Sequence, residues 1–200
     1  HAVVSNNRHD PPLPGEDIQG FEQDLPGENT TGFNSTTITN YPLEVCMTIN
    51  DHWGYSTDDN NTKSTQRLVH LLAKSASAGG NYLLNVGPTA LGEIVPQHAD
   101  RLRGVGNWLQ TYGESIYGTR AGSILPTADV VTTRKDDRHY VHVLNYISDE
   151  VKLSNVPNTI KNASLLSSGE TIAMNWRDDE LVLNIPEDSR DSINTVLVLS

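Results

Sequence analysis

The sequence is short of cysteine, of basic side chains and of long apolar runs, and each shortage excludes a class of protein. Among its 200 residues Cys46 is the one cysteine, so an internal disulfide framework is excluded and a Cys/His zinc site is disfavoured. Lys and Arg number 14 against 25 Asp and Glu, and the net charge of −11 disfavours binding to nucleic acid or to anionic membranes. The longest apolar run reaches about half of a membrane span, which excludes a transmembrane helix.

What the sequence does contain is typical of a folded protein rich in loops and strands. Hydrophobic residues make up 36% of the chain and charged residues 20%, with 15 glycines and 10 prolines. A length of 200 residues fits one large domain or two small ones. The chain opens on His1-Ala2-Val3-Val4 without a methionine, as though in mid-strand, and we therefore expect it to be part of a longer protein.

Residues 1–45 carry many turn sequences and little periodicity, which is typical of a long functional loop system. Two apolar islands, at residues 2–4 and 45–49, predict short buried strands that border this region.

Residues 46–122 alternate between helix and strand signals. A helix is predicted over residues 64–78, where apolar side chains recur at helical spacing until Gly79-Gly80. A second helix is predicted from Pro96 to a stop at Gly113. Between them, residues 81–86 predict a strand buried on both faces. This rhythm predicts an α/β architecture with a parallel sheet or barrel.

Residues 123–200 change the period of the pattern from about 3.6 to 2, which predicts a small antiparallel β-sandwich. We therefore expect two domains, at residues 1–122 and 123–200. Strands are predicted at residues 140–146, 181–185 and 196–199, and charged hairpin turns at 135–138 and 177–180.

Seven histidines invite a metal-binding interpretation that their spacing does not support. His139 and His142 are three residues apart on a predicted strand, so their side chains point to opposite faces. No pair of histidines has the i, i+4 spacing of ligands on a helix. We expect surface and loop histidines and no metal site.

Two carboxylates remain as candidates for chemistry. Glu22 stands in the turn-rich region beside Phe21, and Glu44 stands immediately before the predicted strand at 45–49. A loop glutamate is commonly solvated, so pattern alone stops at an acidic α/β protein with an all-β tail.

Three segments in this order resemble the α-L-fucosidases of glycoside hydrolase family 29. They are Trp53-Gly54-Tyr55, residues 79–88 (GGNYLLNVGP) and residues 113–119 (GESIYGT). The resemblance implies that residues 1–122 are the C-terminal part of a (β/α) TIM-like catalytic barrel and that residues 123–200 are the family's C-terminal β-sandwich.

The resemblance also implies an acid/base glutamate, for which two residues compete. Residues 17–23 (DIQGFEQ) resemble the loop that carries this group in many members, which points to Glu22. Glu44 matches the glutamate of a downstream W-E-x-C-x-T pattern, but Leu43 replaces the aromatic residue, so Glu22 is favoured. The family's nucleophile, an Asp in a W-x-D-like strand, matches nothing here and is expected upstream of His1.

Three further residues are implied to contact the sugar. Arg8 falls at the position of a sugar-binding Arg, with an ion pair at a strand end as the alternative. Trp53 and Tyr55 would offer the flat apolar face that the C6 methyl side of fucose requires, although Tyr55 fits a barrel core equally well. No metal or organic cofactor is implied.

The implied function is that of a retaining exo-α-L-fucosidase acting on fucosylated oligosaccharides or glycoconjugates. The missing N-terminal half of the barrel is then an obligatory partner. The alternatives are a non-catalytic carbohydrate-binding or structural sandwich, and a barrel enzyme for another deoxysugar. We expect a secreted or periplasmic protein, since such substrates are mostly extracellular. Sequons that permit glycosylation occur at Asn29, Asn34, Asn60 and Asn162.

Overall fold

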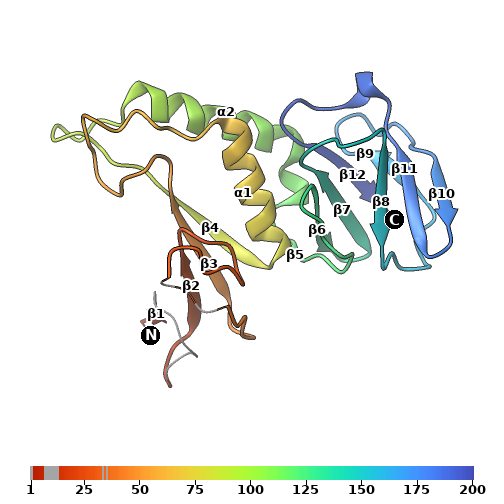
Figure 1. Ribbon diagram of the computed structural model, residues 1–200, viewed down its shortest axis with the longest axis horizontal. Helices are drawn as coiled ribbons and strands as arrows, with labels where there is room; N and C mark the ends of the chain where they lie inside the picture. Colours follow the sequence, from red (N-terminus) through yellow and green to blue (C-terminus); the bar gives the residue numbers. More distant parts are fainter. Residues whose placement is uncertain (1, 7–13, 33, 35) are drawn as a thin grey trace.

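The computed structural model describes residues 2–6, 14–32, 34 and 36–200. In Figure 1 a parallel sheet lies at one end of the molecule and two antiparallel sheets at the other, with the longest helices between them. This arrangement agrees with an α/β unit followed by a β-sandwich. That the parallel strands form part of a barrel stays a prediction.

The parallel sheet has the strand order β1-β2-β3-β4, and every neighbouring pair is parallel. Its strands are β1 (Ser5–Asn6), β2 (Ile18–Glu22), β3 (Leu43–Thr48) and β4 (Gly80–Asn85).

One face of this sheet builds the core of the α/β unit. Alternate side chains of β2 and β3 point to that face, because successive residues of a strand point to opposite sides. They pack against Leu71 of helix α1 (Thr65–Ser77). The buried strand residues in this cluster are Phe21, Leu43, Val45 and Met47.

Three strand predictions need correction. Residues 2–4 are exposed and outside any strand, so the predicted buried strand there is wrong. Glu22 is the last residue of β2, which the turn-rich sequence concealed, and Glu44 is the second residue of β3 rather than its predecessor. The strand β4 is not buried on both faces: Leu83 is 50% exposed, because the face away from α1 has no cover among the described residues.

The two predicted helices are confirmed. The Oγ atom of Ser64 caps α1 by accepting the Arg67 N–H at 3.1 Å, and Gly79 follows the helix with a φ of +83°. Helix α2 (Pro96–Tyr112) has its proline in the first turn and Gly113 as C-cap, and a short 3-10 helix, η1 (Gly113–Ser115), follows. No helix in the described part of the chain is long and apolar enough to cross a membrane.

The remaining strands form a five-stranded sheet, in the order β5-β6-β7-β12-β9, and a three-stranded sheet, in the order β10-β11-β8. All pairings are antiparallel, and the facing sides share one apolar core, as predicted for a sandwich. The predicted turns at 135–138 and 177–180 are confirmed, with Asp136 and Asp178 at φ values of +53° and +54°. The strands are β5 (Arg120–Ala121), β6 (Val130–Lys135), β7 (Arg138–Val143), β8 (Glu150–Ser154), β9 (Ala163–Leu165), β10 (Met174–Arg177), β11 (Glu180–Asn184) and β12 (Thr195–Leu199), and a 3-10 helix, η2 (Glu187–Ser189), precedes β12.

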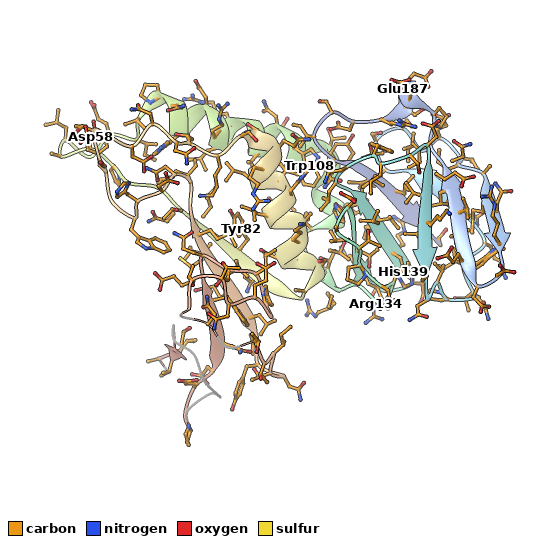
Figure 2. The ribbon with its side chains drawn as sticks, viewed as in Figure 1. Asp58, Tyr82, Trp108, Arg134, His139 and Glu187 are labelled. Atoms are coloured by element: carbon orange, nitrogen blue, oxygen red, sulfur yellow. The ribbon has the colours of Figure 1, made fainter. Side chains whose placement is uncertain are left out.

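The helices also cover the outer face of the five-stranded sheet. Trp108 of α2 lies at this junction (Figure 2) and stacks on Tyr112 with ring centroids 5.1 Å apart. Val69 of α1, Tyr140 of β7 and Val196 of β12 complete the same buried cluster. The α/β unit and the sandwich are therefore joined by apolar packing as well as by the chain. The boundary at residue 122 stays a prediction.

The expectation of surface histidines is wrong for four of the seven. His70, His98, His139 and His142 are all buried, and burial lowers the pKa of each. A neutral imidazole can be buried as a partly apolar ring, and the spacing of the sequence does not reveal where this happens.

His142, which is fully buried at the junction, has a neutral ring that is fully satisfied. Thr133 Oγ1 donates to Ser115 O at 2.6 Å, so it can accept from His142 Nε2 at 3.4 Å. Asn194 Nδ2 donates to His142 Nδ1 at 3.3 Å. Since a proton added to Nδ1 would oppose the Asn194 donor, the contacts agree with the direction of the shift: burial lowers the pKa of His142 to about 4.

We expect the free energy of unfolding to fall as the pH drops from about 6.5 to about 4. In that interval the unfolded histidine binds a proton that the folded one excludes, so acid favours unfolding, with a maximum loss of about 3 kcal/mol. Urea unfolding at several pH values measures this loss. His142→Gln cannot titrate and should show a shallower pH dependence, with a residual slope from the other buried histidines. Equal slopes in the two proteins would contradict the assignment.

Candidate functional site

Glu22 and Glu44 lie on the face of the parallel sheet that points away from α1. The register pairs Glu22 with Cys46 and Gly20 with Glu44, so both carboxylates share a face with the Cys46 thiol. The pKa of the Cys46 thiol is consistent with this proximity. Burial raises this pKa, and the charges of Glu44 and Glu22 raise it further. The two glutamates thus stand on adjacent strands, with Glu22 two residues nearer the carboxyl edge of the sheet.

On the side of β1, the end of β2 is fixed by a side chain instead of by a neighbouring strand. Among the described residues β1 pairs only with Ile18 and Gln19, so it does not reach Glu22. At Glu22 the side-chain amide of Asn34 supplies the hydrogen bonds that a strand would make. Asn34 Oδ1 accepts the Glu22 N–H at 2.8 Å, and Asn34 Nδ2 donates to Glu22 O at 2.9 Å. Glu22 is therefore held at its backbone from the β1 side.

Gln23 holds the same point from the β3 side. Its backbone N–H donates to Cys46 O at 2.8 Å, and its Nε2 donates to Thr48 Oγ1 at 3.0 Å. Its φ of +60° turns the chain out of the sheet directly after Glu22. The position of the Glu22 side chain is thus set by a strand end that is tied on both sides.

Trp53 and Tyr55 lie in the loop after β3, at the same carboxyl edge as Glu22. They are 39% and 47% exposed, so neither belongs to a core formed by the described residues. Asp59 organises this loop, since its Oδ2 accepts from Asn50 Nδ2 at 2.8 Å and from the His52 N–H at 3.1 Å. His52 Nδ1 lies 2.8 Å from the same oxygen, and hydrogen bonds lower the pKa of Asp59, that from His52 most.

Two of the segments that carry the family resemblance touch each other at this edge. The loops after β3 and β4 run side by side, with Asp58 near their outer end (Figure 2). A Cβ atom on Gly87 would lie 2.5 Å from Gly54 C and 2.5 Å from Tyr55 N. Only glycine fits there, because both neighbours are backbone atoms that cannot swing aside.

We expect Gly87→Ala to lower the free energy of unfolding by about 1–3 kcal/mol, because the added methyl forces the Trp53–Tyr55 loop away from the β4 loop. Thermal and urea unfolding measure the loss. Gly106→Ala is the matched control: a Cβ there meets no atom within 4 Å, and alanine favours a helix, so this variant should be as stable as the parent or more so. Equal effects of the two substitutions would show that the close packing of Gly87 against the Gly54–Tyr55 backbone does not contribute to the free energy of unfolding.

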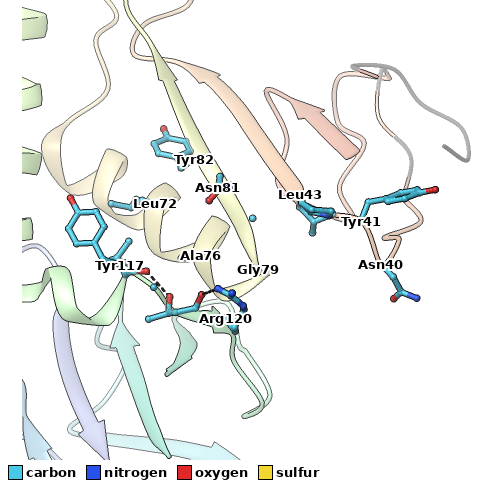
Figure 3. Close-up of a pocket in the computed structure, with 15 residues that line it drawn as sticks. Asn40, Tyr41, Leu43, Leu72, Ala76, Gly79, Asn81, Tyr82, Tyr117 and Arg120 are labelled. Carbon is cyan, nitrogen blue, oxygen red and sulfur yellow. Dashed lines mark hydrogen bonds between the residues drawn. The ribbon is translucent and has the colours of Figure 1, made fainter. Parts of the chain in front are cut away.

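A groove of about 790 Å³ opens at the opposite, amino edge of the sheet, between the starts of β3 and β4 and the segment after η1 (Figure 3). Gly79, Asn81 and Tyr82 line one side, and Tyr117 and Arg120 line the other. No carboxylate occurs among its lining residues, so acid/base chemistry points to the Glu22 edge instead. Residues of the second and third segments, such as Asn81 and Tyr117, thus line this groove.

Glu114, from the third segment, ties the α/β unit to the sandwich. Its Oε1 accepts from Arg138 NH1 at 2.7 Å and from the Tyr140 hydroxyl at 2.6 Å. The Tyr140 hydrogen bond and the Arg138 charge lower the pKa of Glu114. These contacts give Glu114 a structural role at the junction between the two units.

Pattern reasoning missed the residues that support the site. Arg8 lies outside the described residues. Asp24 and Asn34 are 1% and 4% exposed, and nothing in the spacing of the sequence marks them as buried. Asn34 stands in a sequon, yet its Nδ2 donates to Glu22 O and to Asp24 Oδ2 and the residue is buried, so a glycan on it is incompatible with this fold. No group of three His, Cys, Asp or Glu among the described residues could hold a metal.

The profile of the α-L-fucosidase family, described as "Alpha-L-fucosidase", matches residues 1–114. The chain belongs to the α-L-fucosidase family. A curated α-L-fucosidase of Branchiostoma floridae is 33% identical over 150 residues, which cover 72% of this chain and 33% of that protein. The chain thus spans about a third of the length of this relative.

Solved α-L-fucosidases share the fold over nearly the whole chain. Isoenzyme 1 of Paenibacillus thiaminolyticus superposes with a TM-score of 0.80 at 34% identity, over 92% of this chain and 45% of that one. A family 29 enzyme of Bacteroides thetaiotaomicron, described as a trapped covalent intermediate with a fluorinated fucosyl fluoride, gives 0.80 at 25% identity, over 92% and 43%. Both matches extend through the antiparallel sheets, so the sandwich belongs to the shared architecture.

Proposed function

We propose that this chain is the C-terminal part of a retaining exo-α-L-fucosidase, comprising the last strands of a (β/α) catalytic barrel and the β-sandwich behind it. The parallel β1-β2-β3-β4 sheet with α1 on one face supports the barrel assignment, since barrel strands are parallel and carry their helices outside. The opposite face would then line the barrel interior. The missing N-terminal half would cover the exposed side of β4.

One observation carries the proposal: Glu22 ends a parallel strand on the face opposite the helices, at the edge that also bears Trp53 and Tyr55. Active sites of such barrels are built at the carboxyl ends of the strands. At that edge Glu22 would act as the acid that protonates the leaving oxygen and then as the base that activates water. The nucleophile would be an Asp on an upstream strand, as the family resemblance implies. The covalent intermediate described for the Bacteroides relative supports a covalent step in that relative.

Glu44 is the alternative acid/base. It lies at the second position of β3, two residues farther from the carboxyl edge than Glu22. A side chain at that depth is better placed to line the floor of a pocket than to reach a glycosidic oxygen at its mouth, so the geometry favours Glu22.

The substrate would be a terminal α-L-fucosyl group on an oligosaccharide or glycoconjugate. Trp53 and Tyr55, both partly exposed, would cover the C6 methyl side of the sugar, and Arg8 would contact its hydroxyl groups. We further propose that the protein is secreted or periplasmic, where such glycans occur. The chemistry needs two carboxyl groups and water and calls for no metal or organic cofactor.

The full polypeptide should release α-L-fucose as the first-formed anomer from aryl and natural fucosides. Two successive displacements invert the anomeric carbon twice, so retention is the required outcome. Proton NMR in the first minutes of hydrolysis, before mutarotation, measures the anomer. First appearance of the β-anomer would contradict the double displacement, and hydrolysis of another deoxysugar in preference to fucose would contradict the substrate class.

A further inference from the structure

We infer that Asn34, oriented by Asp24, is a positioning residue that holds Glu22 in its catalytic placement. The inference rests on the proposed acid/base role of Glu22 and concerns two buried side chains on the β2–β3 connection.

The Asn34 amide does the work of a neighbouring β-strand. In a sheet, the N–H and C=O of one residue point to the same side and pair with backbone groups of the next strand. Past the end of β1, Asn34 supplies both partners to Glu22 at once, at 2.8 Å and 2.9 Å. A two-point contact fixes the direction of the Glu22 backbone, and with it the origin of the side chain.

Asp24 determines which way the amide faces. Its carboxylate only accepts hydrogen bonds, so Asn34 Nδ2, at 2.7 Å, must point toward it and Oδ1 must point toward the Glu22 N–H. Asp24 Oδ2 also accepts from the Thr30 and Thr31 N–H groups at 3.0 Å and 3.2 Å, and Oδ1 accepts from the Thr30 hydroxyl. Both oxygens of the Asp24 carboxylate are thus held by donors.

The electrostatics agree with a carboxylate held ionised. Burial by itself raises the pKa of Asp24, but hydrogen bonds from Thr30, Asn34 and Thr31 outweigh burial and leave the pKa below its ordinary value. Because Asp24 stays charged across the working range, the orientation of Asn34 does not switch with pH. The arrangement is a fixed support: Asp24 sets Asn34, and Asn34 sets Glu22.

The test uses the full polypeptide and compares a fucoside with a poor leaving group to an activated aryl fucoside. Asn34→Asp keeps the shape but replaces the donor by an oxygen that faces Glu22 O and Asp24. We expect kcat/KM for the poor leaving group to fall about 10- to 100-fold, because displacement of a catalytic group by about 1 Å has such an effect. For the activated substrate kcat/KM should change little, since it needs little protonic assistance.

Two further variants separate positioning from folding. Asn34→Ser removes the amide without placing a second carboxylate beside Asp24, so it should show the same selective loss, which decides the matter if Asn34→Asp does not fold. Thr133→Val, in the buried part of the sandwich, removes the hydrogen bond to Ser115 O and should lower the melting temperature without changing the ratio of the two kcat/KM values.

Suppose that Glu22→Gln shows a loss of kcat/KM confined to the poor leaving group. The inference is then overturned if the Asn34 variants lose kcat/KM equally on both substrates or on neither. If Glu22→Gln itself lacks that selectivity, the acid/base assignment fails and the inference fails with it. The two failures are therefore distinguished by one additional variant.

Discussion

Glu22→Gln in the full polypeptide should lower kcat/KM on natural fucosides by about 10²–10⁴-fold, which is the usual contribution of a positioned general acid. The glutamine cannot protonate the departing sugar oxygen, so substrates with a basic leaving group lose most. The nitrophenolate of a nitrophenyl fucoside leaves as a stable anion without protonation. On such substrates the kcat/KM of the variant should therefore stay near that of the parent enzyme. Steady-state kinetics on both classes measures the difference.

Added azide gives a second readout of the same variant. Without a base at position 22, water attacks the covalent fucosyl-enzyme slowly, so kcat on the aryl substrate should fall even where kcat/KM does not. Azide needs no base and should restore turnover, with fucosyl azide as the product. The control is Glu44→Gln, which lies on the same face. If Glu44→Gln gives this pattern and Glu22→Gln does not, the acid/base is Glu44.

The regular elements were readable from the sequence because each carries a strong local signal. Helix α1 has a Ser64 cap, an apolar stripe and Gly79 at its end, and α2 has a proline in its first turn. The β6–β7 and β10–β11 hairpins are indicated by charged two-residue turns between strands in which apolar and polar residues alternate. These elements follow from neighbours within a few residues of each other.

The support of Glu22 was not readable, because it depends on contacts between distant segments. The strand β2 has five residues and contains Gly20, so its pattern is too short and too irregular to stand out from the surrounding turns. Asp24 and Asn34 are polar residues in a turn-rich stretch, and their burial results from hydrogen bonds made only after β2 joins the sheet. The burial of His70 has the same cause, because its Nε2 lies 2.7 Å from Ile193 O, a residue remote in the sequence.

Residues 1–200 alone should show no α-L-fucosidase activity. Retaining hydrolysis needs a nucleophile about 5–5.5 Å from the acid, on the other side of the anomeric carbon. On the described face opposite α1, the strands offer Glu22 and Glu44 as carboxylates, whereas the alternate positions of β4 are Asn81, Leu83 and Asn85. Leu83 is 50% exposed, so a sugar on this face would meet solvent instead of a closed pocket. Assay with an aryl α-L-fucoside measures the activity.

Complementation makes the negative result informative. The N-terminal half of the polypeptide, added in trans, should restore hydrolysis by supplying the nucleophile and the cover over β4, and it should not do so for a chain carrying Glu22→Gln. Cooperative unfolding of residues 1–200 by itself would show that the absence of activity reflects missing parts and not a missing fold. Activity from the isolated chain would contradict the proposal, because a carboxylate such as Glu44, Asp17 or Asp51 would then have to serve as the nucleophile opposite Glu22.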